Sequence, residues 1–274
     1  EKILESGIRM PPWGAQVRVE AAWDAEMLGL MKKTGCTRLY VGLESINEKT
    51  LQVLNKQSSP EKNEAAIRRF QEAGFSVHGM FVLGSDEDTV ETVRETAHFA
   101  QQSMLGTAQF FSLMTLPGTP LTTRYEEEGK IISRDWRLYD AHHVVIRPAR
   151  MPPHVLQKEL IRAHLRFYSW KEALRHLLFS KDRFYNASMR IFGHALARKI
   201  HRQMRPYGRQ LQALDRWSEE VESRYQRLVR QLGGKMQDVG RELSQTAGPV
   251  RASAEEFLGW LRKSLEKIPR EFLS

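Results

Sequence analysis

The sequence predicts an α/β fold: the C-terminal part of a partial TIM-like β/α barrel with parallel strands, followed by an all-α basic extension. Two observations lead to this prediction. Between Gly14 and Met114, short apolar runs rich in β-branched and aromatic residues alternate with longer segments of helical period. After Pro148, apolar residues recur only at helical spacing and the net charge changes sign. We therefore expect a barrel portion over residues 1–150 and a helical basic extension over residues 151–274.

The first half supplies the strands and the helices between them. Strands are expected over residues 15–19, 38–43, 76–83 and 107–114. The helices carry their own start signals: Asp24 for the first, Ser59-Pro60 for the second, and an approximate capping box of Asp88 and Glu91 for the third. Strand, helix and strand at this spacing require crossover connections, so the sheet is expected to be parallel.

The repeats are too few for a closed barrel. A complete eightfold barrel usually needs about 200 residues or more of such repeats, whereas only about 100 residues show the pattern here. We expect the remaining strands upstream of Glu1, in a longer protein of which this chain is an excised part. In the second half, helices are expected over residues 154–179, 182–204, 208–232 and 253–268.

The cysteine count and the charge distribution limit what the chain does by itself. Cys36 is the one cysteine, which excludes a disulfide framework, a zinc site of several thiolates and a cluster held by three cysteines of this chain. No metal ligands are therefore expected. Residues 1–150 hold 18 basic and 20 acidic side chains, whereas residues 151–274 hold 24 and 13. The sequence shows no leader peptide and no run of about 18 apolar residues, which favours a cytoplasmic protein.

The residues at the expected carboxyl ends of the strands are unusual, and ligands of parallel α/β domains gather there. The second strand ends at Glu44 and Ser45, a carboxylate and a hydroxyl suited to a ribose. The third ends before Gly84, where a missing side chain permits close approach of a flat ligand. Arg18, on the first strand, suits a carboxylate group. The fourth strand is followed by a stiff turn with free backbone groups for an adenine edge: Thr115, Leu116, Pro117 and Gly118.

These residues also have simpler interpretations. Glu44 is of a type common at the start of a helix, and Pro117-Gly118 is common in any turn. His78 alternates along a strand as a core histidine would, and Cys36, at a helix-to-strand turn, suits a small buried residue. The joint occurrence of unusual residues at successive strand ends nevertheless favours a ligand site.

Four ordered motifs resemble the middle and the end of the radical S-adenosylmethionine (radical SAM) domain, most closely in the branch that carries an N-terminal cobalamin-binding domain. The motifs are residues 30–45 (with Leu51 and Lys56 after them), 80–89, 115–119, and 135–140 with Asp135-Trp136 and Tyr139-Asp140. The resemblance covers roughly residues 10–150, which correspond to the C-terminal part of such a domain.

The resemblance implies S-adenosylmethionine and a 4Fe–4S cluster as cofactors, and cobalamin as a further cofactor of the complete protein. In that family the cluster, held by Cys-xxx-Cys-xx-Cys, reduces S-adenosylmethionine to methionine and a 5′-deoxyadenosyl radical, which removes a hydrogen atom from the substrate. The three cluster cysteines are absent here. The cluster ligands are therefore expected outside this chain, and the catalytic residues are unknown.

By the same resemblance, residues of this chain correspond to contacts with S-adenosylmethionine. Glu44 and Ser45 match the ribose contact, Gly84 matches the glycine loop beside adenine, and residues 115–118 match the last adenine-side segment. Arg18 corresponds to a group near the methionine carboxylate. Met80 stands where the family more often has glycine, a departure that bears on the adenine side.

Two classes of function follow from the sequence. The first is part of a radical SAM enzyme that acts by methyl transfer, cyclisation or rearrangement on a small-molecule or lipid-like substrate. The second is a catalytically inactive scaffold that binds a membrane or a partner through its basic tail. For residues 205–274 the leading interpretation is ordinary helices that pack as an accessory subdomain, and the alternative is peripheral contact with the inner face of a membrane. Nucleic-acid binding is not expected, because no recognised motif accompanies the charge.

Overall fold

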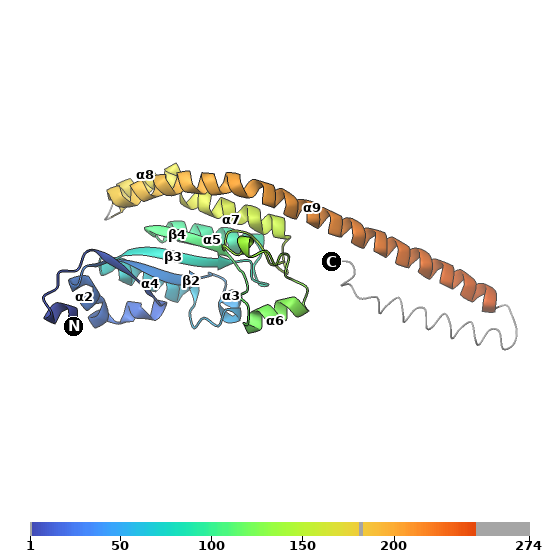
Figure 1. Cartoon of the computed structure of the whole chain (residues 1–274), viewed down its shortest axis with the longest axis horizontal. Helices are drawn as coiled ribbons and strands as arrows, with labels where there is room; N and C mark the ends of the chain where they lie inside the picture. Colours follow the sequence, from blue (N-terminus) through green and yellow to red (C-terminus); the bar gives the residue numbers. More distant parts are fainter. Residues whose placement is uncertain (1, 181–182, 245–274) are drawn as a thin grey trace. The chain divides into compact units, whose positions relative to one another are not determined.

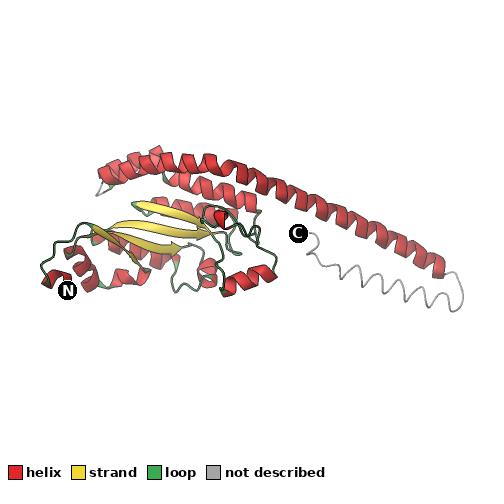
Figure 2. Ribbon diagram, in the orientation of Figure 1, coloured by secondary structure: helices red, strands yellow, loops and turns green. Residues whose placement is uncertain are grey.

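The computed structural model describes residues 2–180 and 183–244 of the chain. A sheet of four strands forms its centre, in the order β1 (Trp13–Val17), β2 (Cys36–Glu44), β3 (Ser76–Leu83) and β4 (Thr107–Ser112) (Figure 1, Figure 2). All three neighbouring pairs are parallel. Each strand therefore pairs with the next one in sequence, as successive strands of a β/α barrel do. The predicted fold class, a parallel α/β barrel portion followed by helices, is confirmed.

Helices connect the strands and continue after the last one. Before β4 they are α1 (Lys2–Glu5), the 3₁₀-helix η1 (Val19–Trp23), α2 (Ala25–Lys33), α3 (Glu48–Val53), α4 (Pro60–Glu72) and α5 (Val90–Gln102). After β4 they are α6 (Pro120–Glu127), the 3₁₀-helix η2 (Trp136–Leu138), α7 (Pro153–Phe167), α8 (Trp170–Phe179) and α9 (Arg183–Ser244).

Two of the three predicted helix starts are confirmed, and the third is wrong in detail. The side chain of Asp24 accepts a hydrogen bond at the start of α2, and that of Ser59 does so at the start of α4. The capping box of α5 is formed by Thr89 and Thr92 instead of Asp88 and Glu91. Asp88 is buried and accepts hydrogen bonds from the preceding loop, so its carboxylate is not free to cap the helix.

The core lies on the helix-covered face of the sheet. Along β2 and β3, alternate apolar side chains such as Leu39, Val41 and Phe81 are fully buried. The Phe81 ring stacks on Phe110 of β4 at a centroid distance of 5.4 Å and meets Phe99 of α5 edge-on at 6.4 Å. This packing fixes the register of the strands, because a slip by one residue would turn these side chains away from the helices.

The helical part differs from the prediction in two ways. The single helix expected over 154–179 is divided into α7 and α8, and Ser169 caps α8 through the backbone N–H of Glu172. In contrast, α9 runs through Pro206 and on to Ser244, where breaks were expected before Gly208 and after 232. Tyr207 donates a hydrogen bond to the carbonyl of Val144 (2.7 Å). We infer that such packing offsets the backbone hydrogen bond that the proline removes.

Two compact units can be distinguished, Glu1–Arg209 and Gln210–Ser274. The sequence-based boundary at residue 150 marks the change from strands to helices. The division into compact units does not test it, so it stays a prediction. The helix expected over 253–268 lies outside the described residues. Among the helices of the described ranges, none combines the length and the apolar character needed to cross a membrane.

Candidate functional site

Glu44, the last residue of β2, has an unusual backbone conformation. Its φ of 60° lies in the left-handed region, which costs a side-chain-bearing residue roughly 1–3 kcal/mol. The pairing of β2 with β3 shifts just before it, because Gly42 lies opposite Met80 and Glu44 opposite Phe81, which leaves Leu43 as an extra residue. Backbone strain of this kind often occurs at ligand-binding positions, so Glu44 is a candidate site residue.

The Glu44 carboxylate is held in place by its neighbours. Lys56 Nζ lies 2.8 Å from Glu44 Oε1, and the carboxylate is mostly buried. A Cβ atom on Gly42 would lie 2.6 Å from the same oxygen, so a larger residue there would displace the carboxylate from this position. In the tripeptide 42–44, Leu43 is the extra residue of the bulge, Gly42 leaves room for the carboxylate, and Glu44 supplies it.

A pocket of about 160 Å³ lies beside Glu44, at the carboxyl ends of β1 and β2. Its lining includes two cations and two carboxylates, those of Arg18, Lys56, Glu20 and Glu44. The exposed Arg18 side chain contacts Glu20 (Nε to Oε2, 3.2 Å). Backbone and ion-pair hydrogen bonding lowers the pKa of Glu20, and its carboxyl group is ionised at neutral pH. The structure therefore brings Arg18 and Glu44, two of the predicted site residues, to one pocket.

Ser45 occupies a different position from its neighbour. It is fully buried, and its hydroxyl oxygen accepts a hydrogen bond from the backbone N–H of Asn47 (3.0 Å). Asn47 in turn caps α3. The role of Ser45 that the geometry shows is to shape the turn from β2 to α3, next to the pocket.

The loop after β3 is organised around Asp88. Its Oδ2 accepts hydrogen bonds from the backbone N–H groups of Gly84 (2.8 Å) and Ser85 (3.0 Å), and Oδ1 accepts one from the Thr50 hydroxyl (2.8 Å). Burial raises the pKa of Asp88, although these donors favour its charged form. The carboxylate holds Gly84 at a φ of 97°, a conformation that glycine adopts without strain.

The turn after β4 is exposed at its tip. Thr115 is buried, Leu116 is exposed, and Gly118 has a φ of 76°, as in a tight turn. Thr119 caps α6 through the backbone N–H of Thr122. The segment from Thr115 to Gly118 therefore presents backbone groups at the same edge of the sheet as Glu44 and Gly84, because parallel strands end on one side.

Side chains tie the loops after β2 and β3 to each other and to the segment beyond α6. Asn47 Nδ2 donates to the carbonyl of Glu87 (3.0 Å), which connects the loop after β2 to the loop after β3. Asp86, in the latter loop, accepts a hydrogen bond from Lys130 Nζ (2.8 Å), beyond α6. We expect this part of the carboxyl edge to behave as one connected structure, because these bonds join its loops.

Sequence reasoning missed several partners at this edge. Lys56 was part of the family motif but was not assigned to Glu44, and Asp86 and Lys130 were not singled out. The hydrogen-bonded Asp88 was read as a helix cap. A signal for Asp88 exists in the sequence, since an aspartate side chain can hydrogen-bond backbone groups three or four residues before it. No comparable signal pairs Lys56 with Glu44 across 12 residues.

A model of the Radical SAM superfamily matches residues 16–100. The matched range contains β2, β3 and Glu44, the strained last residue of β2. This segment belongs to the radical SAM superfamily. The predicted resemblance is confirmed, and the radical SAM segment begins on β1 and ends within α5.

The curated relatives of the radical SAM segment are methyltransferases and cyclases. Bacteriochlorophyllide d C-8(2)-methyltransferase from Chlorobaculum tepidum is 32% identical over 56% of this chain and 34% of its own length. Anaerobic magnesium-protoporphyrin IX monomethyl ester cyclase from Cereibacter sphaeroides is 28% identical over 60% of this chain and 26% of its own length. The chain thus spans about a third of the first of these relatives and a quarter of the second.

Part of the chain also matches a solved structure. The radical S-adenosylmethionine methyltransferase TsrM from Kitasatospora setae, solved with cobalamin and a 4Fe–4S cluster bound, is 21% identical. The match covers 42% of this chain and 23% of that protein, with a TM-score of 0.38.

The residues at this pocket fit the ribose of S-adenosylmethionine better than they fit the whole molecule. A mostly buried carboxylate in a pocket of about 160 Å³ suits the two hydroxyl groups of a ribose, but ligand pockets of proteins usually measure about 300–1,000 Å³. Beside Gly84, Leu156 of α7 already fills the space, because a Cβ atom there would lie 2.4 Å from Leu156 Cδ2. The residues around Glu44 therefore fit the ribose portion alone.

The described residues do not fit a 4Fe–4S cluster. Cys36 is fully buried, its Sγ lies 3.6 Å from the carbonyl oxygen of Arg38, and burial raises the pKa of its thiol. Within residues 2–180 and 183–244, no group of three or more cysteine, histidine or acidic side chains is placed to hold a metal ion. The expectation that Cys36 is a small buried residue is confirmed.

The opposite face of the sheet from the aromatic core carries polar side chains. His78 of β3 contacts Thr107 Oγ1 through Nδ1 (2.7 Å) and Gln109 Oε1 through Nε2 (3.3 Å). The Tyr40 ring lies 4.9 Å from it. Burial lowers the pKa of His78, so the ring is neutral at pH 7. Both nitrogens have partners, which confirms His78 as a satisfied histidine.

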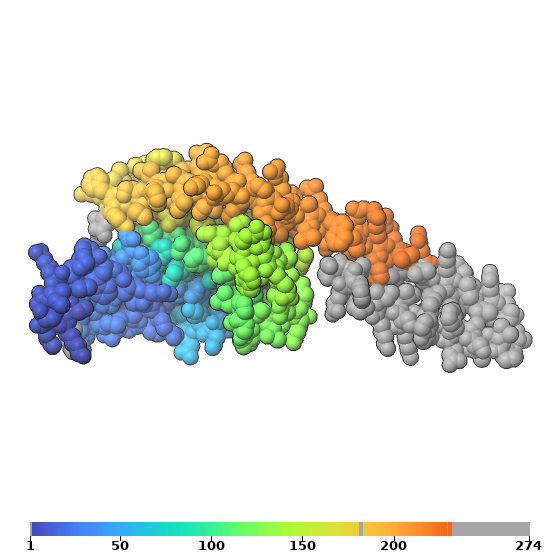
Figure 3. Space-filling view, viewed as in Figure 1, coloured from blue at the N-terminus to red at the C-terminus, as the bar shows by residue number. Residues whose placement is uncertain are grey.

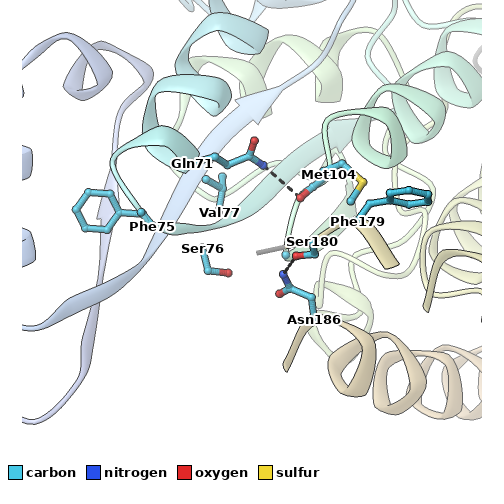
Figure 4. A pocket seen from close by; sticks show the side chains of 10 residues that line it. Gln71, Phe75, Ser76, Val77, Met104, Phe179, Ser180 and Asn186 are labelled. Atoms are coloured by element: carbon cyan, nitrogen blue, oxygen red, sulfur yellow. Dashed lines mark hydrogen bonds between the residues drawn. The ribbon is translucent and has the colours of Figure 1, made fainter. Parts of the chain in front are cut away.

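A larger pocket, of about 340 Å³, lies at the other edge of the sheet (Figure 4). Gln71, Ser76, Met104 and Asn186 are among its lining residues, and Gln71 Nε2 donates to the carbonyl of Met104 (3.2 Å). It adjoins the first residue of β3, at the amino ends of the strands. Active sites of β/α barrels lie at the carboxyl ends, so its larger volume does not make it the candidate site.

Proposed function

We propose that this chain is the ribose-side part of the S-adenosylmethionine site in a longer radical SAM enzyme. The observation that supports this most directly is the strained Glu44, held by Lys56 at the carboxyl end of β2. A carboxylate accepts hydrogen bonds from two neighbouring hydroxyl groups, which is the chemistry that a ribose offers. Arg18 at the same pocket suits the carboxylate of the methionine portion.

The chain's own residues would bind and orient the cofactor. Glu44 fixes the ribose, and the backbone of residues 115–118 and of Gly84 lies along the same edge toward the adenine side. When bound, the cluster would supply the electron that starts radical chemistry on S-adenosylmethionine, with cobalamin as a further cofactor. We propose that both groups are held by residues outside this chain, and that the substrate is a small or lipid-like molecule undergoing methyl transfer, cyclisation or rearrangement.

The alternative is a catalytically inactive scaffold. In a scaffold, the strain at Glu44 would serve no ligand, and replacing the carboxylate would leave the affinity for S-adenosylmethionine unchanged. Cofactor binding therefore separates the two functions more cleanly than turnover does, since turnover also requires the cluster.

Replacing Glu44 by glutamine is expected to weaken S-adenosylmethionine binding by about 10- to 100-fold, because a hydrogen bond to a charged group contributes roughly 1.5–3 kcal/mol. Equilibrium dialysis with labelled S-adenosylmethionine measures this, at millimolar ligand because a site that fits the ribose alone binds weakly. Glu48→Gln is the matched control, an exposed glutamate four residues away in α3. Equal affinities for the two variants and the unmodified chain would contradict the proposal.

A further inference from the structure

Hydrophobic side chains form an exposed stripe along α8. Trp170, Leu174 and Leu178 recur at intervals of four residues, so they lie on one side of this helix. Their exposed fractions are 61%, 57% and 62%, although side chains of this kind are usually buried. The opposite side of α8 packs inward through Ala173 and His176. The stripe is therefore the outer side of a helix that is already packed.

The start of α9 extends this surface. Phe184, Ile191 and Phe192 are 76%, 43% and 64% exposed. The two helices pack against each other, because Arg190 of α9 is hydrogen-bonded to His176 of α8 (2.8 Å) and the rings of Trp170 and His194 lie 6.1 Å apart. Figure 3 shows α8 and the first part of α9, in yellow to orange, as an uncovered side of the unit Glu1–Arg209. We call Trp170, Leu174, Leu178, Phe184, Ile191 and Phe192 the α8–α9 surface.

The charges around this surface have one sign. Residues 170–205 contain nine lysines and arginines but two acidic residues, Glu172 and Asp182. Glu172 is buried, whereas Lys171, Arg183, Arg198 and Lys199 are exposed. An apolar surface with exposed cations nearby is complementary to a partner that has an anionic outer layer and an apolar interior.

We propose that the α8–α9 surface docks on an anionic lipid bilayer. Helices with exposed Trp, Phe and Leu on one side and Lys and Arg nearby lie in the headgroup region, where the apolar side chains enter the acyl boundary and the cations meet anionic lipid. Long basic side chains reach the headgroups while their stems cover apolar surface. The described helices are not suited to crossing a membrane, so the contact is peripheral.

This surface differs from the one considered from the sequence. That alternative contact lay in residues 205–274 and remains a prediction. The α8–α9 surface lies within the unit Glu1–Arg209 and is independent of cofactor binding. A chain that fails to bind S-adenosylmethionine would leave this proposal untouched, and failure to bind lipid would leave the cofactor site untouched.

Vesicle flotation of the 274-residue chain tests the proposal, with phosphatidylglycerol mixed into phosphatidylcholine. The chain is expected to float with these vesicles and not with pure phosphatidylcholine, and salt at about 0.5 M should reduce binding by screening the cations. The triple variant Leu178→Ser, Phe184→Ser and Phe192→Ser should lose at least about tenfold in affinity for these vesicles. Leu214→Ser with Trp217→Ser and Leu228→Ser, which alters exposed residues of 205–274, should lose less binding than this variant. An equal or larger loss would place the main contact outside the α8–α9 surface.

A labelling experiment covers the case in which the triple variant fails to fold. Cys36 is buried and is the one cysteine, so Leu178→Cys introduces a unique accessible thiol for a polarity-sensitive fluorophore. We expect its emission to shift to the blue on adding anionic vesicles, and that of a Val53→Cys control, exposed at a distant helix, to stay unchanged. No shift at position 178, equal binding of the triple variant, or a concentration-dependent dimer without vesicle binding would overturn the proposal.

Discussion

Replacing Arg190 by methionine is expected to lower the free energy of unfolding by about 3 kcal/mol or more. Arg190 of α9 is fully buried and donates hydrogen bonds to the carbonyls of Leu105 (2.8 Å) and Phe167. It also contacts His176 Nε2, and the Phe167 ring lies 3.6 Å from its guanidinium carbon. Methionine fills the space but leaves the acceptors unpaired, each at a cost of roughly 1–3 kcal/mol.

Burial lowers the pKa of Arg190 to about 10, so it remains charged at neutral pH. Its own desolvation offsets part of the benefit, because a buried cation is costly even when it is well bonded. Urea unfolding followed by far-UV circular dichroism measures the loss. The control is Arg198→Met, an exposed arginine of the same helix, which should change the transition little. Coincident transitions for the two variants would show that Arg190 does not hold the helices to the sheet.

Acidification from pH 7 to pH 4 is expected to remove about 3 kcal/mol of stability through His164 alone. Burial lowers its pKa to about 4 from an ordinary value of 6.5. The neutral ring accepts from the Phe110 backbone N–H (3.4 Å) and contacts the carbonyl of Leu160 (3.0 Å). Because the folded-state pKa is lowered, the stabilisation is present above pH 6.5 and is lost as the pH falls toward 4.

The variant His164→Gln should show a shallower fall in stability over this range. Half of the effect should remain, because burial also lowers the pKa of His176 to about 4. His98→Gln, at an exposed histidine of α5, is the matched control and should retain the full slope. Urea titrations at a series of pH values provide the comparison, and parallel curves for His164→Gln and the unmodified chain would contradict the assignment.

Local signals in the sequence account for most of the sheet. The predicted strand over 76–83 matches β3, and those over 38–43 and 107–114 differ from β2 and β4 by two residues at most. The first was predicted two residues too late, since Trp13 and Gly14 at the start of β1 do not read as a strand. These segments were predictable because alternation of apolar residues and flanking caps act within a few residues.

The features that the sequence did not predict depend on distant packing. α9 continues through Pro206, and Tyr207 next to the proline bonds to Val144, a contact across 63 residues that no local propensity contains. Leu156 approaches Gly84 because α7 lies over the end of β3. The helix-to-helix break at Ser169, in contrast, carried a local signal, since serine before an acidic residue three positions later is a typical helix start.

The candidate site was predictable in its identity but not in its geometry. Glu44 and Arg18 were expected at strand ends, and the structure places both at one pocket. The left-handed backbone of Glu44 and the space supplied by Gly42 follow from the bulge, which depends on how β2 pairs with β3. Ser45 was expected beside Glu44 at the ribose, and its burial follows from the same turn.

The most direct test of the central claim is an amide chemical-shift titration of the isotope-labelled chain with S-adenosylmethionine. We predict saturable shifts at the carboxyl edge of the sheet, first at Gly42, Glu44 and Lys56, with smaller ones at Gly84 and residues 115–118. Saturable shifts confined to the amino edge, around Gln71 and Asn186, or none at Glu44 at millimolar ligand, would contradict the claim that this edge binds the cofactor.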